Sequence, residues 1–227
     1  MLPAFRSVTV HNAPLREGVA TEPEWIAQVA ASGVAQAHLW QGEPGWSVPR
    51  SYARSPAWGK GDRGLSVRVS GGGLVPQGPG LENLSLIWCS SAAPSCSDAV
   101  YRGLCAGLQR ALARLGVIAT TQAVAGSFCD GRYNLAADGR KIAGTAQAWR
   151  RIEGRQVVLA HALLIVDADV EALTDAANAI EQALGRPTRY RADAVTSIAR
   201  AWSARHQAPV VADFAATLRQ AIAAQFV

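Results

Sequence analysis

Residues 68–86 read RVSGGGLVPQGPGLENLSL, and the three consecutive glycines at 71–73 interrupt an otherwise apolar, strand-like run. Glycine weakens a strand and loses more conformational entropy on folding than any other residue. A ligand lying against the main chain explains such a run most simply, and a bulge or tight turn is the alternative explanation. We therefore interpret this stretch as a strand, a glycine bend that faces a pocket, and a second strand.

A second informative block follows at residues 138–147, which read DGRKIAGTAQ. An Asp-Gly turn is followed here by a single lysine, Lys141, and then by small residues. A lysine after such a turn is ordinarily a solvated hairpin residue. The small neighbours, which leave room beside Lys141, are the reason to consider it a ligand contact. Together the two blocks predict a pocket for a thin ligand.

Length and composition place the chain among globular proteins. Its 227 residues are 49% hydrophobic, which is enough for a substantial core, and we expect one domain over residues 1–227. No apolar run reaches the roughly 20 residues of a membrane span, and no charged segment leads into an apolar signal core. We therefore expect a soluble, cytoplasmic protein with no membrane partner.

Charge and cysteine content limit the kinds of partner, metal site and disulfide that we expect. The net charge is +5, and the arginines are scattered along the chain, which suits an acidic partner surface or an anionic ligand. No nucleic-acid motif is present, so we expect no nucleic-acid partner. The four cysteines are Cys89, Cys96, Cys105 and Cys129. Their spacing shows no close pairs, so we predict neither a metal site nor disulfides. We expect Cys89, Cys96 and Cys105 to be buried thiols.

Hydrophobic periodicity predicts a mixture of helices and strands. Helices are expected at 21–33, 97–116, 169–185, 193–205 and 211–226. Strands are expected at 37–40, 46–52, 65–70, 84–88, 117–124, 133–137, 141–149 and 157–166. Thr21 and Asp169 are the expected helix caps, and Asp138-Gly139 is the expected hairpin turn. This order of elements predicts the α+β class, with mixed sheets flanked by helices.

Several blocks of the sequence, in this order, resemble the catalytic domain shared by lipoate-protein ligases and octanoyltransferases. The blocks are 38–40 (HLW), 68–73 (RVSGGG), 78–80 (GPG) with 83–85 (NLS), 131–135 (GRYNL), 139–146 (GRKIAGTA) and 161–164 (HALL). The resemblance covers about residues 34–200. It implies a fold related to the biotin-ligase catalytic domain. The arginine- and glycine-rich loop typical of biotin ligases is absent, which disfavours biotin as the substrate.

The resemblance also implies roles for the two informative blocks. Arg68, Ser70 and the glycines Gly71, Gly72 and Gly73 would lie along the acyl or acyl-adenylate ligand. Lys141 would be the invariant lysine of the family, and its ammonium would stabilise the charge that develops during acyl transfer.

Further positions follow from the same resemblance. Gly144, Thr145 and Ala146 would form the wall beside the lysine, and Asn134 would lie near a nucleotide. Trp40 would pack against the acyl chain or its pocket, and packing in the core is the competing interpretation. His161 is either a contributor to the site or a hydrogen-bonded core histidine. Gln77 stands where many members of the family have a histidine. An amide forms hydrogen bonds but is not a base near neutral pH, so a histidine-dependent step at this position is disfavoured.

The implied activity joins a lipoyl or octanoyl group to a lysine of a carrier domain. The expected acceptor is the lipoyl domain of a 2-oxoacid dehydrogenase or a glycine-cleavage H-type protein. The primary hypothesis is a ligase, in which ATP and Mg²⁺ form an acyl-adenylate held by Lys141 and Arg68. After residue 200 we expect only two helices, without the small C-terminal domain of many full-length ligases, which disfavours a self-contained ligase. Some ligases of this family have the corresponding part on another chain.

Two alternatives remain open. In the first, a transferase takes the acyl group from an acyl carrier protein thioester, and Cys129 is the nucleophile. A free cysteine is more often a small buried hydrophobe, which is the competing interpretation of Cys129. In the second alternative, the protein binds lipoate without catalysis.

Overall fold

The computed structural model describes residues 2–59, 64–91 and 96–227. The strands are β1 (Thr9–Val10), β2 (Gln36–Trp40), β3 (Gly45–Pro49), β4 (Leu65–Arg68), β5 (Val75–Gln77), β6 (Leu81–Cys89), β7 (Thr120–Gln122), β8 (Asn134–Ala137), β9 (Arg140–Ile152) and β10 (Arg155–Ile165). The helices are α1 (Glu22–Ser32), α2 (Ser97–Arg114), α3 (Val170–Ala183), α4 (Ile198–His206) and α5 (Phe214–Gln225), with short 3-10 helices η1 (Gly18–Thr21), η2 (Arg50–Arg54) and η4 (Ala192–Ala194). The α+β class is confirmed.

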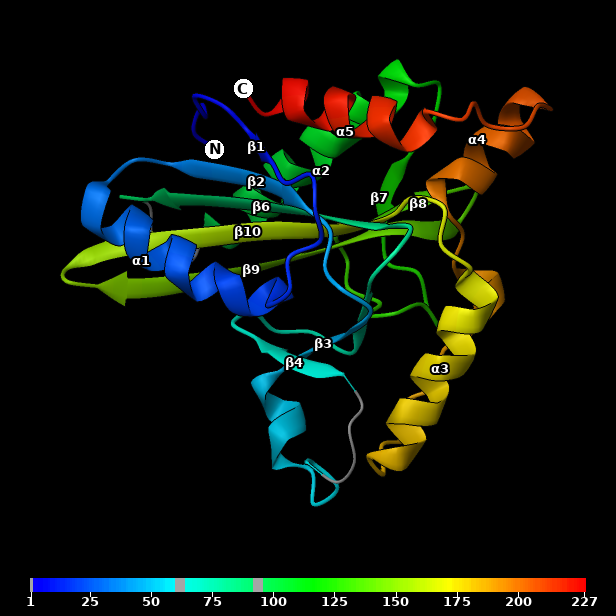
Figure 1. The fold of residues 1–227 in the computed structure, drawn as a ribbon, viewed down its shortest axis with the longest axis horizontal. Coiled ribbons are helices and arrows are strands. Elements are labelled where there is room, and N and C mark those ends of the chain that lie inside the picture. The colour runs from blue at the N-terminus through cyan, green and yellow to red at the C-terminus, as the bar shows by residue number, and fades with distance from the viewer. Residues whose placement is uncertain (1, 60–63, 92–95) are drawn as a thin grey trace.

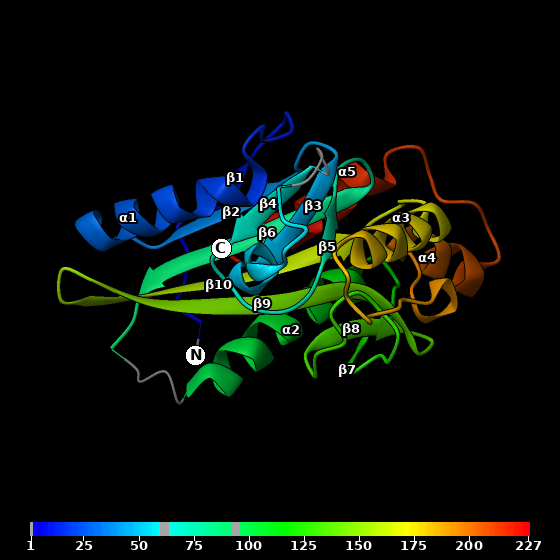
Figure 2. The ribbon, with the colours of Figure 1, turned by 90° about the horizontal axis from the view of Figure 1, so that it is seen from below.

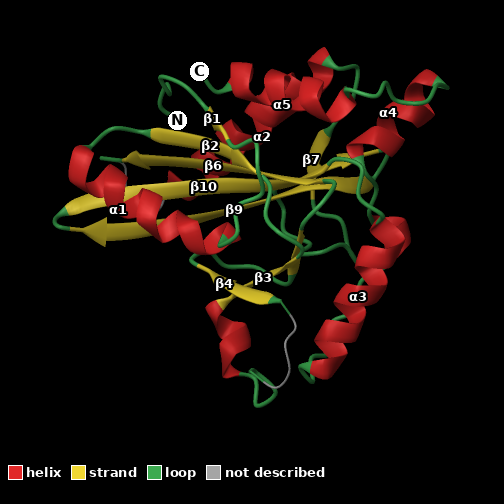
Figure 3. Ribbon diagram, viewed as in Figure 1, coloured by secondary structure: helices red, strands yellow, loops and turns green. Residues whose placement is uncertain are grey.

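Two sheets organise these elements. Within the described residues, the large sheet has seven strands in the order β1-β2-β6-β10-β9-β8-β7, and the small sheet has three in the order β4-β3-β5. Helices α2 and α5 cover one face of the large sheet, while α1 and the small sheet lie against the other face (Figures 1 and 3). Seen from below, the small sheet lies over β6, β10 and β9 (Figure 2).

Alternation along the central strands separates two cores. Leu84, Leu86 and Trp88 of β6 pack into the core under α2 and α5. Ile87 belongs to the core under α1, because successive side chains of a strand point to opposite faces. The face that carries residue 87 also faces the small sheet, so polar side chains at alternate positions of β6 and β10 point into the space between the two sheets.

Several predicted local signals are confirmed. Asp138 and Gly139 both have positive φ, at 48° and 76°, and they form the tight turn from β8 to β9. The Asp169 carboxylate accepts a hydrogen bond from the Ala172 N–H at the start of α3. Gly33 ends α1 in the left-handed conformation.

The prediction that Thr21 caps a helix with its side chain is wrong. The 3-10 helix η1 runs directly into α1, so Thr21 already has helical backbone angles, with φ −74° and ψ −27°, and its side chain makes no capping bond. A side-chain cap ordinarily requires an extended backbone at that residue.

Three predicted elements are shorter in the structure. The strand at 117–124 is reduced to β7, an edge strand that pairs with β8 over three residues. The extended segment at 46–52 ends at Pro49 and continues as η2. The helix at 193–205 begins only at 198, because Ser197 has an extended backbone and its hydroxyl accepts from the Arg200 N–H. Residues 60–63, which precede Gly64, lie outside the described residues.

Cysteine burial is also partly different from the prediction. All four thiols are free, and Cys105 is buried on α2 as expected. Cys96 is exposed and Cys89 is half-buried, so the prediction of buried thiols is wrong for Cys96. Cys96 stands at the N-cap of α2, before the helix reaches the core.

No helix among the described residues combines the length and apolar character that crossing a bilayer demands.

An ion pair attaches α5 to the large sheet. Arg219 on α5 lies 3.3 Å from a carboxylate oxygen of Glu82 on β6, whose side chain is 7% exposed. Burial raises the pKa of Glu82 to about 7, and the nearby Arg219 partly opposes that shift. The folded protein therefore holds a proton on this carboxyl between about pH 4.5 and 7, where the unfolded chain has released it.

Glu82 should therefore make the wild-type protein less stable as pH rises from 4.5 to 7. For Glu82→Gln, which cannot ionise, we expect this part of the pH dependence to disappear. The difference in unfolding free energy between variant and wild type should grow across that range by at most about 3 kcal/mol in favour of the variant. Urea denaturation of both proteins at several pH values measures it, and a difference that does not change with pH contradicts the assignment.

Candidate active site

A cavity lies between the two sheets, at the place where the sequence predicted a pocket. Its space, including the open mouth, is about 600 Å³. The predicted site residues that line it are Arg68, Gly71, Gln77, Cys129, Asn134, Lys141, Gly144, Thr145, Ala146 and His161. Ser70, Gly72, Gly73 and Trp40 are not among its lining residues. Both informative sequence blocks therefore contribute to one cavity.

Arg68 holds the glycine bend in shape. Its Nε donates to the carbonyl of Gly71, Nη2 donates to the carbonyls of Gly71 and Gly73, and Nη1 donates to the carbonyl and hydroxyl oxygens of Ser47. A guanidinium has five N–H donors, so this set occupies all of them. Arg68 therefore acts as a clamp on the main chain, and it has no donor left for a phosphate.

The clamp fixes the orientation of the peptide groups in the bend. Since the C=O and N–H of a trans peptide point in opposite directions, the Gly71 carbonyl at Arg68 turns the Gly72 N–H away from the guanidinium. The Leu74 N–H is turned away in the same manner and donates to the Tyr52 hydroxyl at 3.1 Å. The Gly72 N–H makes no hydrogen bond to any other described residue.

Gly72 is also required by close packing. Its φ is +107°, and a Cβ there would lie 2.7 Å from the Cys129 Sγ and 2.9 Å from an Arg68 nitrogen. Gly71 differs, because a Cβ built on it meets nothing within 4 Å. The bend thus presses against the Cys129 thiol at its second glycine and leaves open space at its first.

Lys141 is buried at the floor of the same cavity. Its ammonium donates to the carbonyl of Phe128 and, at 3.0 Å, to the carbonyl of Cys129. Burial lowers its pKa to about 8, partly offset by the nearby Cys129 and Asp130. An ammonium has three donors, so one remains beyond these two bonds.

Cys129 stands between these cations. Its backbone is left-handed, with φ 52°, a conformation that costs a non-glycine residue energy and is common at functional sites. Its carbonyl accepts from Lys141 and, at 3.1 Å, from the Asn134 amide, which fixes the loop that carries the thiol. Arg68 and Lys141 both lie near enough to the thiol to interact with it electrostatically.

An amide pair lies at another part of the cavity wall. The Gln77 and Asn83 side chains exchange hydrogen bonds of 2.9 and 3.3 Å, and the Asn83 amide also donates to the Trp40 carbonyl at 3.4 Å. Their polar atoms are thus largely paired with each other. Val75, Leu163 and Ile165 contribute apolar wall, so this cavity suits an apolar chain.

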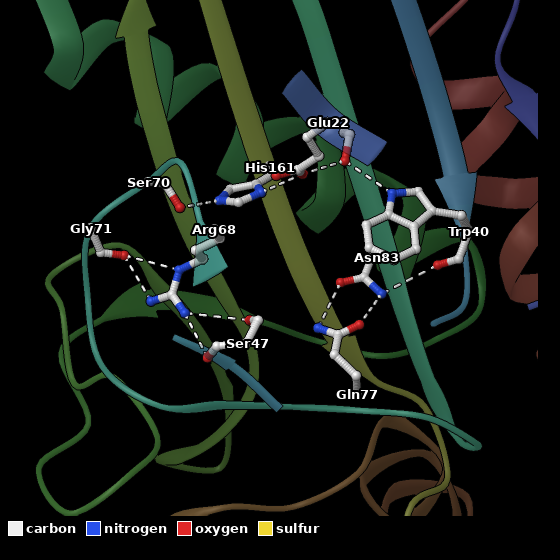
Figure 4. Close-up of polar contacts among 10 residues, drawn as sticks. Glu22, Trp40, Ser47, Arg68, Ser70, Gly71, Gln77, Asn83 and His161 are labelled. Carbon is white, nitrogen blue, oxygen red and sulfur yellow. Dashed lines mark hydrogen bonds and ion pairs between the residues drawn. The ribbon is translucent and has the colours of Figure 1, made fainter. Parts of the chain in front are cut away.

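Trp40 does not line the cavity, which differs from the prediction that it contacts the acyl chain. It is fully buried, packs in the core under α1, and donates from its indole N–H to the Ser85 hydroxyl at 3.0 Å. That hydroxyl in turn donates to Glu22, which is bonded to His161 (Figure 4). Trp40 therefore supports the site from behind.

Sequence reasoning missed Glu22, Asn83 and Phe128. Glu22 lies in the first turn of α1, where an acidic residue is expected merely to favour the helix dipole. Its partner His161 is 139 residues away, and no local signal announces such a pairing. Among the described residues, no cluster of His, Cys, Asp or Glu is arranged to hold a metal ion.

Comparison with known families gives a match over most of the chain. Residues 60–223 match the model of the lipoyl protein ligase A/B catalytic domain. An uncharacterized protein of Cupriavidus necator is 43% identical over 215 residues, covering 86% of this chain and 84% of the relative. An octanoyl-[GcvH]:protein N-octanoyltransferase of Kyrpidia tusciae is 38% identical over 193 residues, covering 78% of this chain and 67% of the relative.

Solved structures agree on the fold. A lipoate-protein ligase A crystallised with ATP superposes with a TM-score of 0.65 at 15% identity, covering 96% of this chain and 94% of that one. A putative lipoate protein ligase of T. acidophilum gives a TM-score of 0.59 at 17% identity, covering 96% and 94%. At such low identity these likenesses concern the fold alone.

The Gly144→Ala substitution should disturb the site through Lys141. The added Cβ would lie 2.8 Å from the Lys141 Nζ and 3.0 Å from its Cε, and the buried amine is held by two carbonyls. We expect the free energy of unfolding to fall by about 1–3 kcal/mol, as for other overpacked cores. Denaturant unfolding measures the loss.

Gly131→Ala is the matched control for that variant. A Cβ at Gly131 meets nothing within 4 Å, so its stability should stay within about 0.5 kcal/mol of wild type. Equal stability of the two variants would show that the amine is not confined as described.

Proposed function

Because the chain belongs to the lipoyl protein ligase A/B catalytic-domain family, we propose that it is the transferase type of this enzyme class, with Cys129 as its nucleophile. The enzyme would move an octanoyl or lipoyl group from a donor carrier onto a lysine of a lipoyl domain. The single observation that carries this proposal is the position of Cys129. Its thiol lies in the cavity against Gly72, between two cations, on a strained loop.

The first step would acylate Cys129. The sulfur attacks the carbonyl carbon of the donor, a C–S bond forms, and the bond from that carbon to the donor's sulfur or nitrogen breaks. The leaving atom keeps the electron pair and takes up a proton. The remaining donor of the Lys141 ammonium and the Gly72 N–H are the groups available to stabilise the negative charge on the carbonyl oxygen.

The second step would pass the acyl group to the acceptor. The lysine amine of the lipoyl domain attacks the thioester carbonyl, a C–N bond forms, and the C–S bond breaks with its electron pair returning to sulfur. The nitrogen loses a proton. The apolar walls would hold the acyl chain in one place through both steps, while the donor carrier leaves and the acceptor domain binds in its place.

Arg68 supports a transferase over the ligase that was the primary hypothesis from sequence. An acyl-adenylate mechanism needs cations that are free to hold a phosphate, and Arg68 uses all its donors on the main chain and on Ser47. The relative from Kyrpidia tusciae, named as an octanoyl-[GcvH]:protein N-octanoyltransferase, favours the same type. ATP and Mg²⁺ would then not be required.

The partners follow from the proposed reaction. The name of that relative points to an octanoylated glycine-cleavage H-type protein as the donor. A lipoyl domain of a 2-oxoacid dehydrogenase is the proposed acceptor, and a structural neighbour is described together with its E2 lipoyl domain. An acyl carrier protein thioester is the alternative donor.

Mass spectrometry of a lipoyl domain tests the proposal. The domain is incubated with the protein and either an octanoylated carrier without ATP, or lipoate with ATP and Mg²⁺. We expect octanoylation of the domain from the carrier alone. Cys129→Ser should reduce the rate about 10³-fold or more, as loss of a nucleophile typically does. Cys105→Ser serves as the control, because that thiol is buried on α2.

Other results would assign the protein differently. Mass gain only with lipoate and ATP would establish the ligase. No gain under either condition would favour a protein that binds the acyl group without transferring it. Gain from the carrier that survives in Cys129→Ser would remove Cys129 from the mechanism.

Gly71→Val should separate acyl binding from folding. A Cβ at Gly71 meets no protein atom within 4 Å and its φ is not left-handed, so the branched side chain would project into open space at the cavity wall. We expect unfolding stability within about 0.5 kcal/mol of wild type and a transfer rate reduced at least tenfold. A variant that transfers octanoate as fast as wild type would show that the acyl chain does not run past Gly71.

A further inference from the structure

Three residues from distant parts of the chain form a hydrogen-bonded chain beside the cavity. The Ser70 hydroxyl lies 2.7 Å from Nε2 of His161, and Nδ1 of the same ring lies 2.7 Å from a carboxylate oxygen of Glu22 (Figure 4). Ser70 begins the glycine bend, His161 stands on β10, and Glu22 starts α1. A hydroxyl, an imidazole and a carboxylate in this order are the arrangement that moves protons in many acyl-transfer enzymes.

The environment of Glu22 determines the direction of these hydrogen bonds. Glu22 is fully buried, and the same oxygen that meets His161 also accepts from the Ser85 hydroxyl at 2.9 Å. That oxygen is an acceptor towards Ser85, and a hydrogen on Nδ1 of His161 lets it accept from the ring as well. In the neutral ring, Nε2 is then an acceptor, and the Ser70 hydroxyl donates to it.

The hydrogen-bonded residues are joined through the main chain to the segment that contacts the proposed nucleophile. Gly72, two residues after Ser70, would place a Cβ 2.7 Å from the Cys129 Sγ, and two residues of chain span at most about 7 Å. His161 lines the cavity, with its side chain 12% exposed, and pairs in backbone register with Ala146 on the neighbouring strand β9. Ser70 is 5% exposed and keeps lone pairs that no other described residue occupies.

We propose that Ser70, His161 and Glu22 form a proton relay for the attack of the acceptor amine on acylated Cys129. The proposal rests on the transferase function proposed above. As the C–N bond forms, the nitrogen gives its proton to the Ser70 oxygen, whose own proton passes to Nε2 of His161. The C–S bond breaks with its electron pair on sulfur. His161 then returns the proton to the Cys129 thiolate, which restores all three groups.

Glu22 is a positioning residue in this scheme. It holds the ring with Nδ1 protonated and stabilises the imidazolium that forms during the transfer. A second buried histidine, His38 on β2, provides a contrast. It is bonded to His11 and Gln36, stacks on Trp25, and does not line the cavity. His38 is therefore a matched control for a histidine with a structural role.

The two half-reactions can be measured separately. The full-length enzyme is loaded with a small octanoyl thioester, whose thiolate leaves without needing the relay, and the acyl-enzyme is confirmed by intact mass. A lipoyl domain is then added and its mass is followed in time. We expect Ser70→Ala, His161→Ala and Glu22→Gln to load, and to transfer about 10²-fold or more slowly than wild type. His38→Ala should transfer at no less than a third of the wild-type rate.

Chemical rescue distinguishes proton transfer from structural support. Added imidazole should restore the transfer rate of His161→Ala at least fivefold, and it should not change that of His38→Ala. A slow His161→Ala enzyme without rescue, or one that transfers as fast as wild type, overturns the relay. If wild type neither loads nor transfers, the transferase function itself fails, which is a different result.

Nitrogen-15 NMR tests the relay without any reaction. The ring signals of His161, assigned by their loss in His161→Ala, should show the tautomer protonated on Nδ1 when the ring is neutral. In Glu22→Gln this preference should weaken. A wild-type ring protonated on Nε2 would contradict the proposed direction of proton transfer.

Discussion

The site depends on a single buried guanidinium. Arg68 is 4% exposed, and its bonds to the carbonyls of Ser47, Gly71 and Gly73 join the small sheet to the glycine bend. Burial lowers the pKa of Arg68 through the cost of removing its charge from water, and the carbonyl oxygens compensate by accepting every N–H. Without this clamp, three glycines in a row would have no reason to keep one conformation.

The clamp has consequences for the chemistry around it. It brings Gly72 against the Cys129 thiol and turns the Gly72 N–H away from the guanidinium. Lys141 donates to the carbonyl of Cys129 and so holds the loop that carries the thiol. Two buried cations beside one thiol are costly for folding. They are consistent with a site in which negative charge develops on sulfur and on a carbonyl oxygen. Burying these charges therefore lowers the local stability of the fold.

Much of the fold could be predicted from the sequence, because the signals are local. The apolar run of β10, the turn at Asp138 and Gly139, and the cap at Asp169 each depend on a few neighbouring residues. The edge strand β7 was overestimated, since its length is limited by its partner β8 and not by its own side chains.

The candidate site was predictable only in part, for the same reason. Glycines and a lysine among small residues marked the wall, whereas the pairing of Glu22 with His161 depends on how α1 crosses β10. Trp40 was placed beside the ligand by the family resemblance alone, but the period of β2 directs it into the core under α1. Long-range contacts of this kind are set by packing between elements and leave no trace in sequence spacing.

The most direct test of the account is a crystal structure of the enzyme trapped with an octanoyl group. The account predicts continuous density from the Cys129 Sγ into the cavity, with the thioester carbonyl oxygen within hydrogen-bonding distance of the Lys141 ammonium or the Gly72 N–H. An acyl chain bound outside the cavity, or one held there with Cys129 turned away from its carbonyl carbon, would contradict it.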